Sequence, residues 1–386
     1  MARGRLGESM SEKKSKPTSF HRAANDGNTD GLTPLTTLDL GSVADIDELL
    51  AGMALTSFGG RNLGEAAEVL ESMVLDPECT VVLTLSGAMT VAKMNLVIVE
   101  MVERGWVQGI VSTGALMTHG LVELAGMQHF KAKRDLDDKT LFEQGYNRVY
   151  DTYEPEKNLN DLSDLLHEVF LKMPTDRRWA SRELLSEIGA HLAPSGKRGI
   201  MSTCYREGVP VYVPAFSDSE LALDMAVSFL GQQIEDDPDA DLESLLGNFQ
   251  TPFDPFLDLA HFAELVSKSP KMGIVTIGGG VPRNWAQQAP PFLDIINFRL
   301  GREVPIPRYQ YGVRICPEPV HWGGLSGCTY SEGVSWGKFV PKDEGGRYSE
   351  VYADATIAWP ILVKAVGQRL DKAQKTACSP DLKLRR

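Results

Sequence analysis

The chain has 386 residues, of which 42% are hydrophobic and 24% are charged, and its formal net charge is -13 with an isoelectric point near 5.1. A chain of this length can bury a large core, and it fits one large domain or two smaller ones. The negative charge argues against binding through nucleic-acid phosphates and favours a polycationic ligand.

The five cysteines are odd in number and form no Cys-x-x-Cys pair. We therefore predict neither a disulfide framework nor a metal site, and we expect a reducing, cytoplasmic compartment. The best candidate for a membrane span, 81–102, contains Lys93, Asn95 and Glu100, so no membrane partner is expected. The first residues also lack the apolar region of a secretory signal.

The chain begins with a polar segment, residues 1–34, that is basic at first and then rich in Asn, Asp and Gly. We predict that this segment is flexible or docked on a neighbour. A single α/β domain is predicted over 35–375, and a short C-terminal tail over 376–386. Apolar residues on one face predict two helices at the start of the domain, over 46–55 and 64–74.

A strand, a turn of small residues and a helix then alternate along the domain. Short apolar runs rich in β-branched residues predict strands at 80–85, 109–113, 209–213 and 272–277. Helices are predicted over 90–103 and from 118 onwards. This alternation predicts an α/β fold with a Rossmann-like parallel sheet and helices on both faces. A more polar helical insertion is predicted near 130–205, with helices around 162–170 and 181–191.

The last of these strands runs directly into three glycines, Gly278, Gly279 and Gly280. Backbone amides without side chains could approach a diphosphate closely here, and a following helix would add its dipole. The glycines do not form the Gly-x-Gly-x-x-Gly fingerprint, so taken alone they also fit an ordinary tight loop.

A second segment, 326–338, places a lysine beside an indole and close to a carboxylate. Lys338 could form an imine with a carbonyl-like substrate if burial or nearby positive charge lowers its pKa. Trp336 offers a face for a cationic amine, and Glu332 could hold an ammonium group. A Trp-Gly-Lys tripeptide is also common in ordinary turns.

The whole segment, Ser-Gly-x-x-x-x-Glu-x-Val-Ser-Trp-Gly-Lys, resembles the active-site segment of the deoxyhypusine synthase family. These NAD-dependent enzymes move an aminobutyl group from spermidine to a protein lysine, and homospermidine synthases derive from them. The resemblance implies that Lys338 carries a covalent imine, that Trp336 lines a polyamine tunnel and that Glu332 contacts a substrate amine. The family also carries Gly-Gly-Gly-Val at its NAD site, in the same order along the chain.

Further segments resemble those that contact NAD in this family. Besides the glycine loop, the resemblance implies NAD contacts for Ser86, Gly87, Ser112, Thr113, Gly114, Asp218, Asp354 and Ala355. At the carboxyl end of a strand an Asp can accept ribose hydroxyls, although a lone Asp there is also commonly a helix cap. Asp224 aligns with an acidic substrate residue if one extra residue is allowed after Asp218.

The chain also departs from the family pattern. Asn284 stands where the eukaryotic enzymes have a substrate-contacting histidine, and Leu325 replaces an acidic residue before Ser-Gly. Thr118 and His119 replace an acidic pair, and Cys316, Pro317 and Glu318 replace an Asn-Thr-Ala stretch. His119 could contact substrate as a base or could be a structural histidine. These departures resemble the bacterial, deoxyhypusine synthase-like branch.

The resemblance implies NAD as cofactor, a polyamine donor, and a homotetramer with active sites at a dimer interface. Two acceptors stay open, a protein lysine and putrescine, and the second would make the chain a homospermidine synthase. A non-catalytic homologue that binds NAD or a polyamine is the remaining alternative, because the missing acids could abolish activity.

Overall fold

The computed structural model describes residues 26–133, 137–174 and 176–377. The chain divides into two units, Met1–Thr36 and Thr37–Arg386. In the described part of the first unit, Asp26 accepts hydrogen bonds from the backbone and the hydroxyl of Thr29, at 2.8 and 2.7 Å. Most of the segment predicted to be flexible, 1–34, lies outside the described residues.

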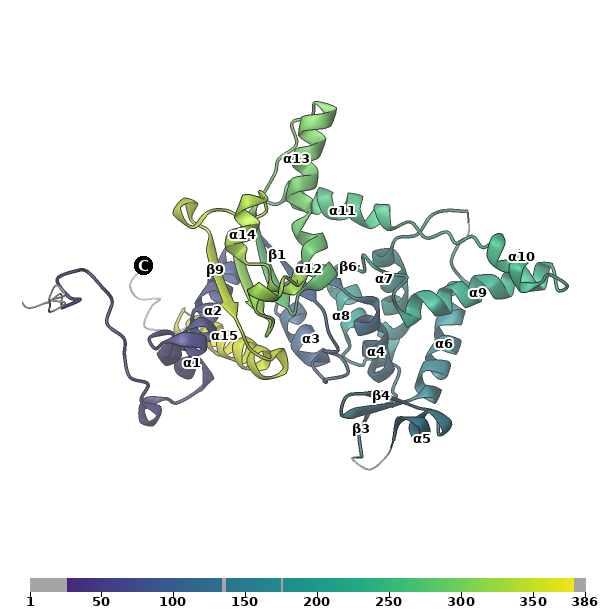
Figure 1. Cartoon of the computed structure of the whole chain (residues 1–386), viewed down its shortest axis with the longest axis horizontal. Helices are drawn as coiled ribbons and strands as arrows, with labels where there is room; N and C mark the ends of the chain where they lie inside the picture. Colours follow the sequence, from purple (N-terminus) through teal and green to yellow (C-terminus); the bar gives the residue numbers. More distant parts are fainter. Residues whose placement is uncertain (1–25, 134–136, 175, 378–386) are drawn as a thin grey trace, which may run out of the picture. The chain divides into compact units, whose positions relative to one another are not determined.

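The second unit is built on a six-stranded parallel sheet with the order β6-β2-β1-β7-β8-β9 (Figure 1). The strands are β1 (Cys79–Leu85), β2 (Gly109–Ser112), β6 (Val211–Tyr212), β7 (Lys271–Ile277), β8 (Tyr309–Ile315) and β9 (Arg347–Val351). The predicted α/β class with a parallel sheet is confirmed. Each of the four predicted strands is present, and β8 and β9 extend the sheet beyond them.

Helices cover both faces of this sheet, as predicted, because alternate residues of each buried strand point to opposite sides. In β1, Val81, Leu83 and Leu85 join the larger hydrophobic core, which also contains residues of α2, α3 and α15. The intervening Val82 joins a second core with residues of α11, α12, α13 and α14. The two cores therefore lie on opposite faces of one sheet.

The helices follow the strands in chain order. They are α1 (Ile46–Ala54), α2 (Phe58–Leu75), α3 (Asn95–Glu103), α4 (Gly114–Leu124), α5 (Asp138–Glu143), α6 (Glu156–Phe170), α7 (Ser181–Leu192), α8 (Ile200–Glu207), α9 (Glu220–Asp236), α10 (Leu242–Gly247), α11 (Pro255–Lys268), α12 (Gly280–Gln287), α13 (Ala289–Leu300), α14 (Tyr330–Ser335) and α15 (Ala355–Ala377). Short 3-10 turns lie at Leu40–Ser42, Ala193–Ser195, Val320–Trp322, Leu325–Gly327 and Lys342–Glu344. The helix predicted over 90–103 begins only at Asn95, because Lys93 has a left-handed φ of 66°.

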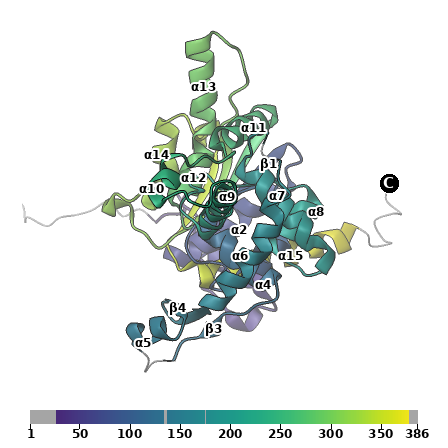
Figure 2. The same cartoon turned by 90° about the vertical axis from the view of Figure 1, so that its right-hand side faces the viewer.

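The insertion contains a second, three-stranded antiparallel sheet with the order β3-β5-β4. Its strands are β3 (Phe130–Lys131), β4 (Tyr146–Val149) and β5 (Thr152–Pro155). Figures 1 and 2 both show this small sheet, with α5, apart from the six-stranded sheet. The two predicted helices of the insertion are α6 and α7, and the buried Leu162, Leu166, Val169 and Phe170 form the apolar face of α6.

Successive strands are added in opposite directions from the centre of the six-stranded sheet, although all six strands run parallel. From β1 the chain proceeds through β2 to β6 on one side, and from β7 through β8 to β9 on the other. In open α/β sheets, ligands bind at the carboxyl ends of the strands, beside such a switch point. The carboxyl ends of β1 and β7 are therefore where a bound nucleotide is expected.

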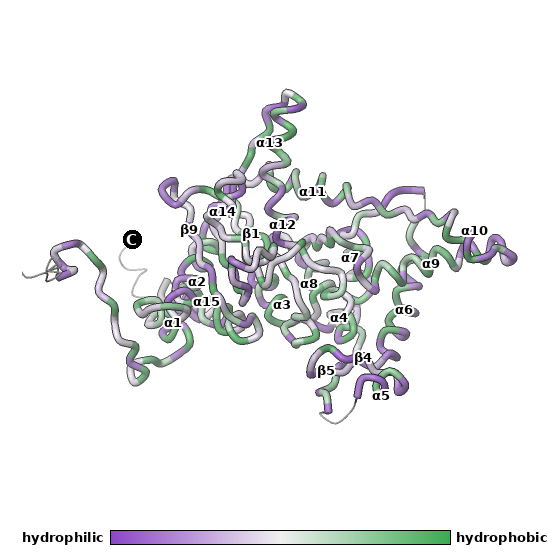
Figure 3. Tube along the Cα trace, viewed as in Figure 1, coloured by the Kyte–Doolittle hydropathy of each residue, from purple (hydrophilic) through white to green (hydrophobic). Residues whose placement is uncertain are grey.

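Hydropathy follows the layers of the fold. Figure 3 shows hydrophobic residues along the inner strands and helices and hydrophilic residues around α10. In the part of the chain that the structure describes, no helix combines the length and the apolar character that a membrane span requires.

Candidate active site at the carboxyl edge of the sheet

The strands of the six-stranded sheet end in one row of paired residues. Leu85 pairs with both Ser112 and Ile277, and the row continues through Ile315 to Val351. The segments with the predicted NAD contacts Ser86, Thr113, Gly278 and Asp354 begin at or just after the ends of these strands. Most of the predicted NAD contacts therefore lie along one edge of the sheet.

The glycine loop and the loop after β1 touch at the switch point. Ser86 Oγ accepts a hydrogen bond of 2.8 Å from the Gly279 amide. A Cβ on Gly278, whose φ is +78°, would lie 2.3 Å from Ser86 Oγ, and a Cβ on Gly279 would lie 2.6 Å from Ser326 Cα. Both glycines are thus required by the close approach of neighbouring segments.

The third glycine of the loop, Gly280, is the first residue of α12 and has a φ of +62°. Apart from its chain neighbours and the backbone of its own helix, no heavy atom of the described residues lies within 4 Å of the position that its Cβ would occupy. Open space at a helix N-terminus suits an anionic group such as a diphosphate, because backbone amides and the helix dipole both favour negative charge there.

The loop after β2 lies beside the start of α9. Gly114 begins α4, and a Cβ there would lie 2.3 Å from the side chain of Ser219. Ser219 caps α9 and follows Asp218, which is exposed. The buried Ser112 donates a hydrogen bond to the Thr113 carbonyl at 3.1 Å. The predicted NAD segment 112–114 is thus a neighbour of Ser219, the residue that follows the predicted contact Asp218.

Asp354 follows β9 and precedes the first residue of α15, Ala355. Its carboxylate accepts hydrogen bonds from the Thr356 amide at 2.6 Å and the Thr356 hydroxyl at 2.7 Å. These two hydrogen bonds lower the pKa of Asp354, and the bond from the Thr356 hydroxyl has the larger effect. The alternative interpretation of Asp354, a helix cap, is therefore observed, and its contact with a ribose stays a prediction.

Lys338 is buried, and its backbone is held at the start of β8. The Tyr309 amide donates to the Lys338 carbonyl at 3.0 Å, and the Lys338 amide donates to the Gly333 carbonyl at 3.1 Å. The side-chain Nζ donates to Asn284 Oδ1 at 3.2 Å. Because Asn284 lies one turn into α12, this contact connects the candidate nucleophile to the helix that starts at the glycine loop.

The surroundings of Lys338 favour the free amine. Burial is the largest cause that lowers the pKa of Lys338, and the positive charge of Arg283 lowers it further, against the opposing effects of Cys328 and Glu332. Arg283 is only 2% exposed, and its guanidinium carbon lies 5.5 Å from the centre of the Tyr330 ring. Its Nε and Nη2 have no hydrogen-bond partner within the described part of the chain. An uncompensated positive charge thus lies near the amine.

A buried ion pair holds the segment before Lys338 against the sheet. Arg314 on β8 donates to the carbonyls of Ser326, at 2.5 Å, and Cys328, at 3.0 Å. It also pairs with Glu350 on β9 at 3.1 Å, and Glu350 accepts from the Tyr330 amide at 2.7 Å. Charge-assisted bonds of this kind are short and strong, so they fix where the segment enters α14.

The other two predicted residues of this segment are exposed. Glu332 lies in the first turn of α14, where its amide donates to Thr329 Oγ1 at 3.0 Å. Trp336 follows the helix and is 66% exposed. Both side chains are therefore available to a ligand or to another subunit at the surface near Lys338.

Comparison with known proteins decides the family. A family model described as deoxyhypusine synthase matches residues 48–366. This chain belongs to the deoxyhypusine synthase family. It is 32% identical over 338 residues to "Probable deoxyhypusine synthase 2" of Methanosarcina acetivorans, which covers 86% of this chain and 89% of that protein.

Two further similarities agree with this family. The chain is 33% identical over 321 residues to "Probable deoxyhypusine synthase 2" of Archaeoglobus fulgidus, covering 83% of this chain and 98% of that protein. A crystal structure from Entamoeba histolytica that carries a deoxyhypusine synthase name superposes with a TM-score of 0.51 at 14% identity. It covers 86% of this chain and 96% of that one, and it supports the fold.

Two substrate residues suggested by the resemblance to deoxyhypusine synthase have partners other than Lys338. His119 Nδ1 lies 2.6 Å from Glu154 Oε2. Burial lowers the pKa of His119, but the hydrogen bond and the negative charge of Glu154 outweigh it, so the pKa is raised. Asp224 lies on α9, where burial raises the pKa of its carboxyl despite a hydrogen bond with Ser163. No hydrogen bond or ion pair joins either residue to Lys338 in the described chain.

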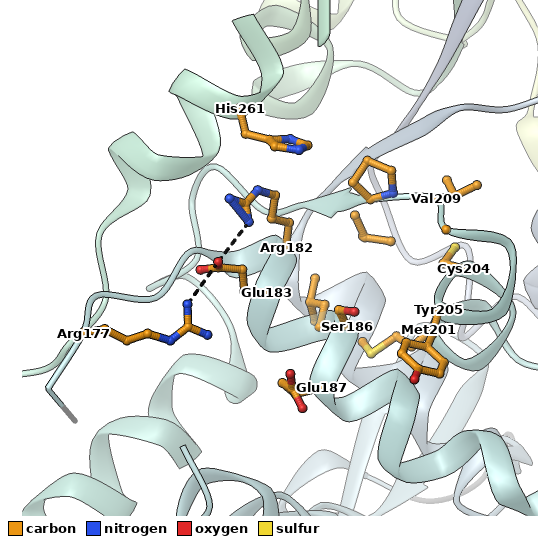
Figure 4. Close-up of a pocket in the computed structure, with 14 residues that line it drawn as sticks. Arg177, Arg182, Glu183, Ser186, Glu187, Met201, Cys204, Tyr205, Val209 and His261 are labelled. Carbon is orange, nitrogen blue, oxygen red and sulfur yellow. Dashed lines mark hydrogen bonds and ion pairs between the residues drawn. The ribbon is translucent and has the colours of Figure 1, made fainter. Parts of the chain in front are cut away.

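A separate cavity of about 390 Å³ lies at the opposite edge of the sheet, before β6 (Figure 4). Its lining includes Val209, His261 and an ion-paired group in which Arg177 and Arg182 lie 3.3 and 3.4 Å from Glu183. None of the predicted site residues lines it. The deoxyhypusine synthase-like segments and this cavity are therefore distinct features.

Sequence reasoning missed Arg283, which acts on Lys338, and the Arg314–Glu350 pair, which holds the segment before it. Arg314 carried a usable signal, because a charged residue between Val313 and Ile315 interrupts an otherwise apolar run. Its pairing with Glu350 follows from the register of β8 and β9 and could not be read from either segment alone.

Proposed function

We propose that this member of the deoxyhypusine synthase family transfers an aminobutyl group from spermidine to an amine acceptor, through an imine on Lys338 and with NAD as cofactor. The observation that carries the proposal is the position of Lys338. Its amine is buried, its pKa is lowered, and it contacts Asn284 on the helix that begins at the glycine loop.

Formation of the imine on Lys338 requires a lysine that is a free base near neutral pH, because only the unprotonated amine attacks an imine carbon. Burial and the charge of Arg283 both favour that form. The exposed Trp336 and Glu332 would receive the cationic ends of the polyamine, with Asn284 as a neutral contact beside the nucleophile. Asp224 would be a further amine contact, and His119 would reach a substrate only through Nε2, since Nδ1 faces Glu154.

The residues at the carboxyl edge fit NAD. Two glycines allow the loops after β1 and β7 to touch, and open space beside Gly280 admits a diphosphate at the start of α12. The cofactor would be held by Ser86, Gly87, Ser112, Thr113, Gly114, Asp218, Gly278, Gly279, Gly280, Asp354 and Ala355. Bound NAD supplies hydride acceptance from the carbon beside the secondary amine, which turns that carbon into an electrophile.

The acceptor is the less constrained part of the proposal. The names of the relatives favour a protein lysine, whereas Asn284 and the exposed Leu325 depart from the family pattern at the substrate rim. A rim with fewer specific contacts need not match a protein surface. We therefore expect putrescine to be accepted at least as readily as a protein lysine, which would give homospermidine.

We also propose that the chain forms a homotetramer whose active sites lie at dimer interfaces. Large apolar side chains near the candidate site are exposed in the single chain, among them Trp322 at 72% and Trp336 at 66%. Exposed groups of this size commonly mark a subunit interface.

The test is to incubate the purified protein with NAD and spermidine labelled in its aminobutyl part, with putrescine, with an acceptor protein, or with both. Release of diaminopropane together with a labelled product supports the proposal. Label in homospermidine selects the small-amine acceptor, and label in a protein lysine selects the deoxyhypusine reaction. Absence of diaminopropane in every mixture, with NAD binding intact, would instead support a non-catalytic homologue.

A further inference from the structure

A compact group of metal-binding side chains lies between α4 and the small sheet of the insertion. His119 projects from α4, His129 precedes β3, and Glu154 lies on β5. The nitrogen and oxygen atoms that could act as ligands all lie within 4.8 Å of one another. The closest approaches are 2.6 Å from His119 Nδ1 to Glu154 Oε2 and 3.4 Å from His129 Nε2 to Glu154 Oε1.

These side chains are buried and incompletely paired. The side chains of His119, His129 and Glu154 are 16%, 0% and 2% exposed. Among the described residues, His119 Nδ1, His129 Nε2 and Glu154 Oε1 are buried without a partner of proper hydrogen-bond geometry. Most buried polar atoms in folded proteins have such a partner, so three atoms that meet only in close ion-pair contacts, without hydrogen-bond geometry, require an explanation.

We propose that His119, His129 and Glu154 bind one divalent transition-metal ion, with zinc as the best fit to the donor set. Two imidazoles and one carboxylate are a common zinc set, with ligand distances of about 2.0–2.2 Å. Ligands at that distance around a tetrahedral ion lie about 3.4 Å apart. The observed separations of 2.6 and 3.4 Å, with all ligand atoms within 4.8 Å of one another, lie on either side of this value, so the side chains would shift to reach the arrangement.

The neighbours of the two histidines suit this role. A histidine that binds a metal through one nitrogen carries a proton on the other and usually donates it to a carboxylate. Glu220 acts electrostatically on His119, and its buried Oε2 has no hydrogen-bond partner in the described chain. For His129, the nearby carboxylate is Glu123: Lys93 contacts both side chains.

One neighbour in the described part of the chain, Lys93, opposes metal binding. Its Nζ lies 2.9 Å from His129 Nδ1. In this arrangement the ammonium of Lys93 donates a hydrogen bond to Nδ1, and the proton of the neutral imidazole is on Nε2. Metal binding at Nε2 requires that proton to leave and Nδ1 to carry one instead. Lys93 is 44% exposed and is ion-paired with Glu123 at 2.5 Å, so it can turn towards water while Glu123 accepts from Nδ1.

The bound ion would attach the insertion to the main sheet. His119 belongs to α4, which starts at the end of β2, whereas Glu154 belongs to the small sheet. Three protein ligands leave a fourth position for water. The sequence predicted no metal site because its cysteines lack a metal-binding spacing, and the site proposed here departs from that prediction with ligands that are not cysteines. The inference does not depend on the chemistry assigned to Lys338.

The experiment uses the full chain without a histidine tag, stripped with a chelator and then titrated with Zn²⁺ against a chromophoric competitor. We expect one ion per chain and a loss of affinity of at least about 100-fold in both His129→Gln and Glu154→Gln. The exposed His191→Gln and Glu143→Gln serve as matched controls with unchanged affinity. Mg²⁺, which prefers oxygen ligands, should not compete.

A second variant keeps the test decisive if Glu154→Gln does not fold. Lys93→Met should raise Zn²⁺ affinity, because the ammonium no longer occupies the outer nitrogen of His129, and Co²⁺ should give visible bands of a four- or five-coordinate ion. Absence of stoichiometric Zn²⁺ binding in both the natural chain and Lys93→Met would overturn the proposal. Binding that survives both ligand substitutions in folded protein would also overturn it, since the ion would then lie elsewhere.

Discussion

Two buried polar regions of this molecule have opposite electrostatics. Around Lys338, burial and the unpaired charge of Arg283 lower the pKa of the amine and favour its neutral, nucleophilic form. Around His119, the buried carboxylate of Glu154 outweighs burial and favours a cation. The first region suits attack on a carbon centre, whereas the imidazolium favoured in the second must lose its proton before His119 can bind a metal ion. The sign of a neighbouring charge therefore helps to set which protonation state each region favours.

The largest expected effect comes from Lys338→Arg. A guanidinium stays protonated and cannot form an imine, so we expect aminobutyl transfer to fall by at least about 10³-fold while NAD binding persists. Steady-state release of diaminopropane measures the rate. Lys342→Arg, a neighbouring exposed lysine, is the matched control and should keep full activity. A rate in Lys338→Arg within tenfold of the natural chain would remove Lys338 from the chemistry.

Gly279→Val should abolish NAD binding, with a loss of about 100-fold or more in affinity. The added side chain would meet Ser326, whose Cα lies 2.6 Å from the Cβ position, and would push the glycine loop away from the loop after β1. Calorimetric titration with NAD measures the effect, and thermal unfolding checks the fold. Gly59→Val, at a position where a Cβ would meet no described atom within 4 Å outside its own helix and its chain neighbours, is the control. Unchanged NAD affinity in folded Gly279→Val would place the cofactor elsewhere.

Glu332→Gln should weaken polyamine binding by about 1–3 kcal/mol, the scale for a hydrogen bond to a charged group. NAD affinity should hardly change, because Glu332 lies on α14 and not on the glycine loop. Spermidine titration in the presence of NAD gives the affinity, and Glu344→Gln on the nearby surface is the control. Equal spermidine affinity in both variants would exclude Glu332 from the amine site.

Arg283→Met should have the smallest effect and should show in the pH profile. Removing a positive charge beside Lys338 lets its pKa rise, so a larger share of the amine is protonated at neutral pH. We expect the rate at pH 7 to fall by about tenfold or less, and the rise of activity with pH to move to higher pH. A buried unpaired charge replaced by an apolar side chain is not expected to unfold the chain. A pH profile identical to that of the natural chain would contradict the role of Arg283.

The sequence predicted the strands that carry their own signal. β1 and β7 are apolar runs followed by small residues, and both were located to within a residue or two. β8 and β9 were missed, because Gln310, Gly312 and Arg314 interrupt one and polar residues make up most of the other. Such strands are stabilised by pairing and packing with their neighbours and not by local propensity. The short strands of the insertion were missed for the same reason.

The same distinction holds for the candidate site. Glu332, Trp336 and Lys338 lie in one segment and could be recognised together. The Arg314–Glu350 pair and the cluster of His119, His129 and Glu154 are each assembled from distant segments. Only the strand register and the fold of the insertion bring these residues together. A single sequence can therefore indicate the candidate nucleophile, whereas it does not show which buried charges distant segments bring together.

The most direct measurement of the central claim is borohydride trapping of the protein with NAD and spermidine labelled in its aminobutyl part, followed by peptide mapping. The imine on Lys338 should be reduced to a stable amine, so we predict one labelled peptide that contains Lys338, and none without NAD. Label on a different lysine, or diaminopropane release without any trapped adduct, would contradict the account.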